Sequence, residues 1–217
     1  MKQGETEARE GAGRRVAATR PRRWRHGLRP ACSALAASAV FLAATTTGGR
    51  PLSATASTSL EYEVKAAFLF RFAQFVEWPA ATFKSADEPF TYCTIGDDPF
   101  RGALERTLNG KTIGERTLRV EHLNGSGKIG ECQVLFVGGP SDKKHVEEAL
   151  ASTGGLPILT VGEADQFAKD GGAIGFCTED SKIRFEVNLD AAGKAGLKIS
   201  AKLLALAKAV LRVPKGT

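Results

Sequence analysis

The chain has 217 residues, of which 42% are hydrophobic and 25% are charged. This composition is that of a soluble globular chain with one ordinary domain or two small ones, and it excludes a disordered or collagen-like chain. The formal net charge of +6 would suggest nucleic acid as a partner if it were spread evenly. Residues 1–56, however, contain ten Lys/Arg and three Asp/Glu, whereas the rest of the chain contains 20 and 21. The basic charge belongs to the N-terminal segment, so we expect no nucleic-acid binding.

The N-terminal segment has the pattern of an export signal. Five arginines from Arg20 to Arg29 form a basic region, and residues 31–44 form an apolar run shorter than the ~20 residues of a membrane-spanning helix. Small residues at positions 54–56 fit a signal-peptidase site, so we expect cleavage after Ala56. The predicted organisation is a leader over residues 1–56 and one exported domain over residues 57–217 that does not insert into the membrane.

The first half of the domain alternates between helical and strand patterns. Apolar residues at helical spacing predict a long amphipathic helix over residues 60–78, which Pro79 ends. A β-rich run at residues 90–96 precedes a short helix at residues 100–108, for which Asp97 or Asp98 is the expected N-cap. The next predicted elements are strands at residues 116–123, 132–138 and 157–161, a helix at 141–152 and a helical turn at 163–169.

The second half ends in a hairpin and a helix. Strands at residues 173–177 and 182–188 flank an expected four-residue loop, Thr-Glu-Asp-Ser. Residues 200–212 predict a terminal helix. Strands separated by helices indicate a single-domain α/β sandwich, with a mostly parallel sheet, helices on both faces and a C-terminal antiparallel hairpin. The buried stripe of the terminal helix should contain Leu203, Leu204, Ala207 and Leu211.

The domain lacks the residue combinations that are typical of catalysis. Asp97 and Asp98 follow a strand as in phosphoacceptor domains, but the strand at residues 132–138 ends in Gly-Gly-Pro without an acceptor Asp, so turn formation or capping explains them better. Ser141 and His145 are adjacent on a predicted helix, where a cap and an exposed histidine are commoner than a nucleophile pair. We therefore expect a protein that is not an enzyme, with no catalytic residues and no cofactor.

Three cysteines lie in the exported domain, namely Cys93, Cys132 and Cys177. Their spacing fits no C-x-x-C motif, and neither His122 nor His145 lies at ligand spacing from them, so we expect no metal site. In an oxidising compartment two of the three can pair and one is left over. The spacing alone leaves the pairing open.

The long predicted helix carries more aromatic residues than one buried stripe needs. Phe70 falls away from the face that Phe68, Phe72 and Phe75 share. Either the sheet and the terminal helix cover this helix on two sides, or aromatic surface is left for a partner or a second copy.

Sequence motifs throughout the domain resemble those of the YfiR family of periplasmic proteins. The opening motif is Tyr-Glu-Val-Lys-Ala-Ala-Phe-Leu-Phe at residues 62–70, followed by Phe-Val-Glu-Trp-Pro at residues 75–79. The resemblance continues in order through residues 93–100, 110–111, 132–137, 158–161, 167–176, 183–188 and 195–204.

The resemblance implies a non-enzymatic periplasmic regulator. The family's namesake holds an inner-membrane diguanylate cyclase inactive by binding its periplasmic sensor domain, which lowers cyclic di-GMP and biofilm formation. We expect a partner of this kind, a diguanylate cyclase or a sensor kinase, and a homodimer is left open. The alternative is a periplasmic small-ligand-binding module that acts with a sensor kinase or transport system, with its site at the carboxyl ends of the parallel strands near residues 96–99 and 138–141.

The resemblance also implies a cysteine pair and a partner surface. Cys93 and Cys132 match cysteine positions of the family on neighbouring predicted strands, so we predict a disulfide between them, with Cys177 free or intermolecular. The partner surface is predicted from the aromatic helix and from the late strand, whose polar residues alternate with apolar ones. Its residues are Phe68, Phe70, Phe72, Phe75, Trp78, Arg184, Glu186 and Asn188.

Overall fold

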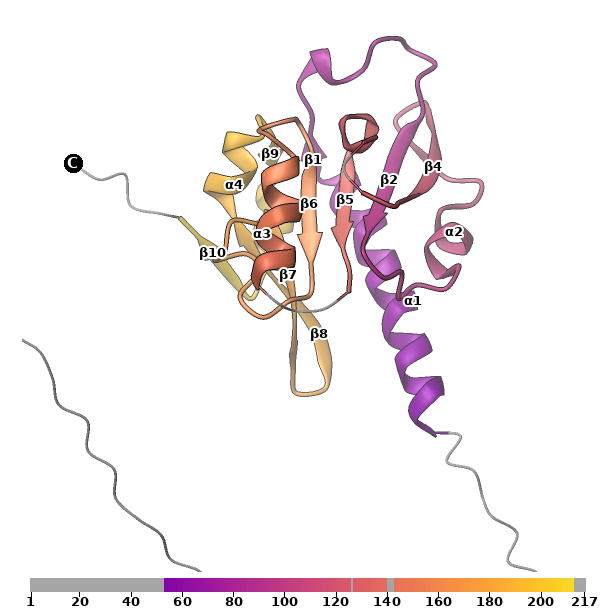
Figure 1. The fold of residues 1–217 in the computed structure, drawn as a ribbon, viewed down its shortest axis with the longest axis vertical. Coiled ribbons are helices and arrows are strands. Elements are labelled where there is room, and N and C mark those ends of the chain that lie inside the picture. Colours follow the sequence, from indigo (N-terminus) through magenta and orange to yellow (C-terminus); the bar gives the residue numbers. More distant parts are fainter. Residues whose placement is uncertain (1–52, 126, 140–142, 213–217) are drawn as a thin grey trace, which may run out of the picture. The chain divides into compact units, whose positions relative to one another are not determined.

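The centre of the fold is a mostly parallel sheet (Figure 1). The computed structural model describes residues 53–125, 127–139 and 143–212. The strands in spatial order are β10 (Ala209–Leu211), β8 (Lys182–Asn188), β7 (Ile174–Glu179), β6 (Leu159–Gly162), β5 (Val134–Val137), β2 (Phe90–Ile95), β4 (Arg116–Leu123) and β3 (Thr112–Ile113).

Two antiparallel pairs flank the parallel centre of the sheet. The pairs from β4 through β2, β5 and β6 to β7 are parallel, and so is the pair β8–β10. The antiparallel pairs are β7–β8 and β3–β4. The predicted α/β class with its late hairpin is therefore confirmed. The hairpin loop is shorter than predicted, because pairing continues to Glu179 and Lys182 and only Asp180 and Ser181, both with positive φ, make the turn.

Helices cover both faces of this sheet. Figure 1 shows α3 on the near side of the sheet and α1 on the far side. A second, two-stranded sheet pairs β1 with β9 antiparallel. The helices are α1 (Ser53–Gln74), α2 (Ala103–Leu108), α3 (Lys143–Ser152), α4 (Leu189–Lys194) and α5 (Ala201–Leu204), with 3-10 turns at Ala80–Thr82 and Ile129–Glu131, and the small sheet contains β1 (Val76–Glu77) and β9 (Lys198–Ile199).

The predicted leader lies largely outside the described residues. Its last residues belong to α1, which begins at Ser53, so the expected cleavage after Ala56 falls in the first turn of this helix. The division into a leader and an exported domain remains a prediction.

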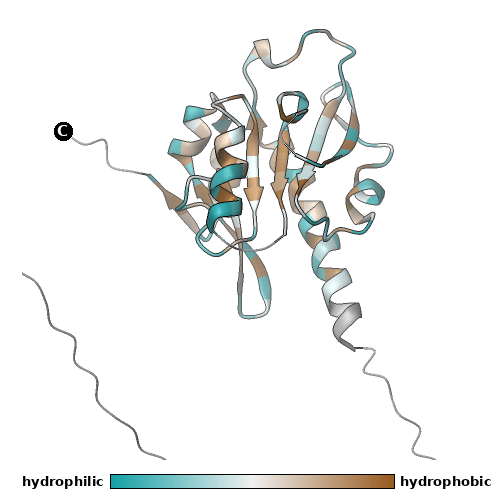
Figure 2. Cartoon of the chain, in the orientation of Figure 1, coloured by the Kyte–Doolittle hydropathy of each residue, from teal (hydrophilic) through white to brown (hydrophobic). Residues whose placement is uncertain are grey.

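The core is divided by the sheet into two apolar clusters. The larger one lies between the sheet and α1, with Phe72 and Leu69 from the helix and Phe136 and Ile174 from the strands. The smaller one lies on the α3 side, where Val146 and Ala149 of that helix are buried. Figure 2 shows hydrophobic residues concentrated in β5 and β6, and hydrophilic residues on the outer side of α3. The amphipathic pattern of α3 therefore decides which of its faces packs on the sheet.

The C-terminal helix predicted for residues 200–212 is wrong. Ser200 caps a single turn, α5, and the chain then enters β10, whose start is fixed by the bond from Lys208 N–H to Phe185 O at 2.9 Å. The stripe residues have different positions, since Leu203 is buried in the core whereas Leu204, Ala207 and Leu211 are half-buried. The open side of β8 offers main-chain partners that a short apolar run can take as a strand.

Other helix boundaries also differ from the prediction. The long helix ends at Gln74 instead of Trp78, because Val76 and Glu77 pair with β9. Residues 163–169 form turns, not a helical segment. The helix α2 starts only at Ala103, since the Asp98 carboxylate accepts a bond from Phe100 N–H at 3.0 Å in a turn instead of capping the helix.

Candidate functional site

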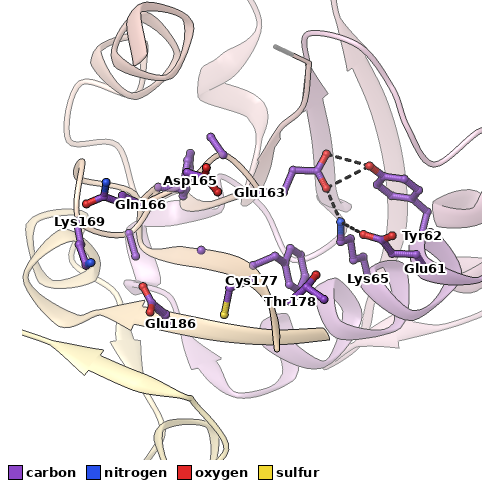
Figure 3. A pocket seen from close by; sticks show the side chains of 15 residues that line it. Glu61, Tyr62, Lys65, Glu163, Asp165, Gln166, Lys169, Cys177, Thr178 and Glu186 are labelled. Carbon is purple, nitrogen blue, oxygen red and sulfur yellow. Dashed lines mark hydrogen bonds and ion pairs between the residues drawn. The ribbon is translucent and has the colours of Figure 1, made fainter. Parts of the chain in front are cut away.

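A pocket of about 530 Å³ opens at the carboxyl end of β6 (Figure 3). One wall is the middle of α1, with Glu61, Tyr62 and Lys65. A second wall is formed by the turns at residues 163–169, directly after the strand, and the third comes from β7 and β8. The carboxyl ends of parallel strands are where α/β sheets commonly bind ligands.

A buried lysine organises one side of this pocket. The Lys65 side chain is 7% exposed, and its Nζ donates to Glu163 Oε2 at 2.5 Å and to Glu61 Oε1 at 2.6 Å. The Tyr62 hydroxyl donates to the same Glu163 carboxylate, at 3.1 and 3.2 Å from its two oxygens. The ammonium also lies 4.5 Å from the centre of the Tyr62 ring. These contacts connect α1 to the segment after β6, as the dashed lines in Figure 3 show.

The position of Lys65 follows from helix periodicity. Lys65 lies four residues before Leu69 and seven before Phe72, so it is on the buried stripe of α1. A cation in this position must be paired to avoid a large desolvation cost, and Glu61 one turn earlier supplies a carboxylate within the helix. The sequence analysis missed this group. A charge inside an apolar stripe was the available signal, but Glu163, 98 positions later, could not be assigned as its partner.

The electrostatics of the pocket are dominated by carboxylates. Burial and then the Glu163 charge raise the pKa of Tyr62, so this phenol is a hydrogen-bond donor at neutral pH. The Glu61 and Glu163 carboxylates both form ion pairs with Lys65 and neutralise its charge. This lysine is therefore not available to an anionic ligand. The remaining charged groups of the lining are Asp165, Lys169 and Glu186.

The same pocket contains the one cysteine that the described residues leave outside a disulfide. Cys177 is half-buried, and burial is the largest of the effects that raise the pKa of its thiol. A raised pKa disfavours the thiolate that a nucleophile needs. Within the described residues, no group of three or more His, Cys, Asp or Glu is placed to hold a metal ion.

The cysteine pairing is as predicted. The structure has a disulfide between Cys93 of β2 and Cys132, which precedes β5, with Cα atoms 5.8 Å apart. Both half-cystines are buried in the cluster on the α3 side. Whether Cys177 is free or joined to another molecule stays a prediction.

The aromatic residues of α1 lie mostly against the core. Phe72 is fully buried, with its ring 4.9 Å from that of Phe185 and 5.7 Å from that of Phe176. Phe68 is half-buried against the same two rings. A partner therefore cannot contact Phe72 in this fold, and the surplus of aromatic residues is explained largely by packing against β7 and β8.

The other aromatic residues of the predicted surface are also half-buried. Phe70 lies beneath the Lys111 ammonium, which is 4.6 Å from the ring centre. Trp78 packs edge-on against Phe90 at 4.9 Å. Phe75 packs at the margin of the α1-side core. These side chains present only part of their surface to solvent.

The predicted polar row of β8 is only partly available to a partner. Arg184 is exposed and Glu186 is half-buried, whereas Ile183, Phe185 and Val187 lie on the other side of the strand, as the alternation predicted, and pack in the α1-side core. Asn188 is 6% exposed, and its amide donates to Ala168 O at 2.6 Å while its Oδ1 caps α4. The sequence analysis missed α4 and with it this capping role of Asn188.

The aromatic helix and the polar row do not form one face. Phe185 contacts α1, and because alternate residues of a strand point to opposite faces, Arg184 and Glu186 point away from that helix. The continuous surface expected from sequence is therefore replaced by two separate regions. Glu186 and residues of α1 come together only at the pocket, whose lining includes both.

The strand ends expected to bind a small ligand are in close contact between Gly96 and Gly138. A Cβ at Gly138 would clash with the Asp97 carbonyl, and one at Gly96 would clash with the Gly138 carbonyl. The His145 Nε2 lies 3.0 Å from the same Gly138 oxygen. Residues 140–142 of this region lie outside the described residues. A hollow of about 660 Å³ beside Asp97, Asp98 and Pro99 is the part of the predicted position that stays open.

Fold and site together define a single α/β domain with a polar pocket at the carboxyl edge of its sheet. The sequence profile of the YfiR/HmsC-like family matches residues 62–208. The chain belongs to this family, which consists of periplasmic regulators. Among the described helices, none has both the length and the apolar character that crossing a bilayer requires.

Two solved structures have a distant likeness to this chain. One is a conserved domain protein from Vibrio cholerae O1 biovar El Tor, with 10% identity and a TM-score of 0.45 over 69% of this chain and 60% of its own. The other is an ABC domain in complex with L-Trp from Streptococcus pneumoniae, with 12% identity and a TM-score of 0.40 over 56% and 55%. The chain thus spans about 60% and 55% of their lengths.

Proposed function

We propose that the protein is a periplasmic regulator that binds the periplasmic sensor domain of an inner-membrane signalling protein and represses a diguanylate cyclase. The observation that carries the proposal is the family match over residues 62–208. Repression lowers cyclic di-GMP and thereby biofilm formation. The protein acts by binding and carries out no reaction of its own.

The contact region that fits this role is the pocket together with the outer side of β8. Arg184 is exposed and Glu186 is half-buried there, and within the described residues neither side chain forms a hydrogen bond or ion pair, although the Glu186 charge, after the larger effect of Glu179, also raises the pKa of Lys208. Charged side chains without internal partners can form new pairs with a partner at little structural cost. The half-buried Phe68, Phe70, Phe75 and Trp78 contribute apolar area at their margins.

The test is a charge reversal at Glu186. Glu186→Lys should change the melting temperature little, because within the described residues this side chain forms no hydrogen bond or ion pair and only a longer-range attraction to Lys208, and it should weaken binding by about tenfold or more. Deleting the gene should raise cellular cyclic di-GMP, and expression of the wild type, but not of Glu186→Lys, should restore it. Pull-down from the inner-membrane fraction, followed by mass spectrometry, measures partner binding directly.

The matched control reverses a charge elsewhere. Glu148 of α3 has a 67% exposed side chain and, among the described residues, one ion pair, with Lys144 at 3.7 Å, so Glu148→Lys should restore cyclic di-GMP like the wild type. A Glu186→Lys protein that unfolds would show that Glu186 is structural. If it folds and represses normally, β8 is not part of the contact, and a deletion without any change in cyclic di-GMP contradicts the function itself.

A second candidate function is a small-ligand-binding module that acts with a sensor kinase or transport system. The observation in its favour is the polar pocket at the carboxyl end of β6. Native mass spectrometry of the protein isolated from the periplasm is the direct test. A reproducible added mass that Glu163→Gln removes would favour this function over direct contact alone.

A further inference from the structure

The charge of the domain is unevenly distributed along the chain. Residues 57–188 contain 14 Lys/Arg and 20 Asp/Glu, whereas residues 189–217 contain six and one. The C-terminal segment is therefore strongly cationic on a domain that is otherwise acidic. Five of its six cations and its one carboxylate lie in the part of the chain that the structure describes.

The described part of this segment, residues 189–212, folds as one layer, which we call the C-terminal layer. It contains α4, β9, α5 and β10, and α4 contacts both β9 and β10. Figure 1 shows α4, β9 and β10 together at the left end of the fold. The buried side chains of Ala192, Leu197 and Leu203 attach the layer to the α1-side core. These three residues define its inner side.

Three lysines of the layer lie away from this inner side. Lys194 follows the buried Ala192 by two positions, which puts the two about 200° apart around α4. Lys198 alternates on β9 with Ile199, which packs against the α1-side core. Lys202 is on the single turn of α5. All three side chains are exposed, and within the described residues none of them forms a hydrogen bond or ion pair.

Few carboxylates lie near these lysines. Glu77 of β1 is opposite Lys198, but the two form no ion pair in the structure. Asp190, in the first turn of α4, is the one carboxylate of the layer. Lys208 differs from the other cations, because it pairs with Glu179 at 3.2 Å. The cations that the described residues leave without an ion pair are Lys194, Lys198, Lys202 and Arg212.

Two large apolar side chains of the same layer are exposed. Leu206, in the turn between α5 and β10, is 65% exposed, and Val210 of β10 is 41% exposed. Val210 is paired with Val187, whose side chain lies in the α1-side core, so Val210 is on the side of the sheet that carries α4 and α5. Arg212, two residues later, shares this side by alternation. Exposed apolar groups and unpaired cations therefore occur on the same side of the fold.

A bilayer with anionic lipids fits this combination better than a macromolecule that offers charge alone. Its phosphates attract cations, and the apolar region directly beneath them accepts exposed leucine and valine side chains. A nucleic acid would use the cations only. The chain belongs to a periplasmic family, so a membrane surface is within its reach.

We propose that the C-terminal layer binds the surface of a membrane that contains anionic lipids. The four unpaired cations contact lipid phosphates, and the two exposed apolar side chains enter the headgroup region. The binding is peripheral. The inference does not rest on the proposed function, because Arg184 and Glu186 of that contact region point to the other side of the sheet.

The first experiment is co-sedimentation of the purified exported protein with lipid vesicles. The protein should sediment with vesicles of phosphatidylglycerol and phosphatidylcholine in equal parts, and should stay in solution with phosphatidylcholine alone. About 0.5 M NaCl should release most of the bound protein, because salt screens the attraction. Equal binding to both kinds of vesicle, or binding to neither, would overturn the proposal.

Two variants with the same net charge distinguish this layer from a general charge effect. The first combines Lys194→Gln, Lys198→Gln and Lys202→Gln. The control combines Lys128→Gln, Lys143→Gln and Lys144→Gln, at exposed positions outside the layer. Because each cation at an anionic membrane strengthens binding about fivefold, the first variant should bind about a hundredfold more weakly, and the control should lose less than about fivefold. Equal losses would refute the assigned surface.

A third variant, Leu206→Ser, distinguishes a membrane from an acidic protein. It should bind the phosphatidylglycerol vesicles about threefold or more weakly, because less apolar area enters the bilayer, and should bind soluble polyglutamate as the wild type does. Unchanged vesicle binding would show that charge alone is recognised. That result favours an acidic protein as the occupant and contradicts the proposal.

An environment-sensitive fluorophore locates the contact. It is attached to Val210→Cys in exported protein that also carries Cys177→Ala, and its emission should shift to the blue when phosphatidylglycerol vesicles bind. The control is Leu156→Cys in the same background, at an apolar residue after α3 that is exposed to a similar extent, 39%, and it should show no shift. No shift at Val210 while vesicles are bound would mean that another face meets the membrane, and the proposal would fall.

Discussion

The two faces of the central sheet are stabilised in different ways. The face under α1 buries a large set of aromatic and aliphatic side chains without any covalent link. The face under α3 has a smaller cluster, and the Cys93–Cys132 disulfide lies within it. Under the long helix α1, apolar burial alone is enough to stabilise the face of the sheet. Under the ten-residue helix α3, a disulfide adds to the stabilisation by burial.

The faces also differ in how they treat charge. The α1 side accepts a nearly buried cation, Lys65, because it lies at the pocket where two carboxylates reach it. The charges of α3 stay outside, as the Lys143–Glu147 and Lys144–Glu148 pairs with largely exposed side chains show. A buried charge is therefore a property of the pocket and not of helix packing in general.

The largest loss of stability should come from removing a buried side chain between α1 and the sheet. Phe72→Ala removes a fully buried ring with three aromatic neighbours and should lower the free energy of unfolding by about 3–5 kcal/mol. Urea unfolding followed by circular dichroism measures it. Val64→Ala on the same helix, at a 39% exposed residue, should cost less than about 1 kcal/mol. Similar costs for both variants would contradict the assigned orientation of α1.

Removing the cross-link should be the next largest change. The disulfide joins residues 39 positions apart, and Cys93→Ala with Cys132→Ala should lower the free energy of unfolding by about 2–4 kcal/mol. Cys177→Ala should change it by less than about 1 kcal/mol, since this thiol is half-buried. Peptide mapping without reduction checks the pairing, and a Cys93–Cys177 fragment would refute it.

Replacing the buried Lys65 by a neutral residue should have an intermediate effect on the free energy of unfolding. Lys65→Met leaves Glu163 without its ion pair and should cost about 1–3 kcal/mol, less than for a fully buried pair because Glu61 and Glu163 are 40% and 20% exposed. Lys143→Met on α3 should cost under about 0.5 kcal/mol. Adding Glu163→Gln to Lys65→Met should recover part of the loss. A larger loss in the double variant would mean that Glu163 has a further role.

The smallest expected effect is a pH dependence limited to alkaline solution. The folded-state pKa of Tyr62 is raised by burial and by Glu163, so the unfolded chain releases this proton first. The stabilisation is complete below the ordinary tyrosine pKa of about 10 and is lost as the pH rises above it. Tyr62→Phe should therefore show a shallower loss of stability between about pH 10 and 11 than the wild type in urea titrations. Parallel curves would contradict the hydrogen bond between the Tyr62 hydroxyl and Glu163.

The candidate site could be predicted from the sequence only in part. The alternation of β8 correctly separated Ile183, Phe185 and Val187 from Arg184 and Glu186, because a strand has only two faces. It could not show that Asn188 is used as the cap of α4, or that Glu186 and the aromatic helix lie on opposite faces of the sheet. The Lys65–Glu163 pair was also invisible, because its partners are distant in the sequence.

The sequence by itself determined the strongly patterned elements. The alternation of β8 has the period of a strand and the pattern of α3 has that of a helix, whereas the apolar runs of β5 and β6 are identified as strands by their short length. The tertiary structure alone decided the ends and edges. Residues 209–211 are a short apolar segment whose sequence fits a helix or a strand equally well. They form β10 because β8 offers them unpaired main-chain groups. These groups are available only once the sheet has formed.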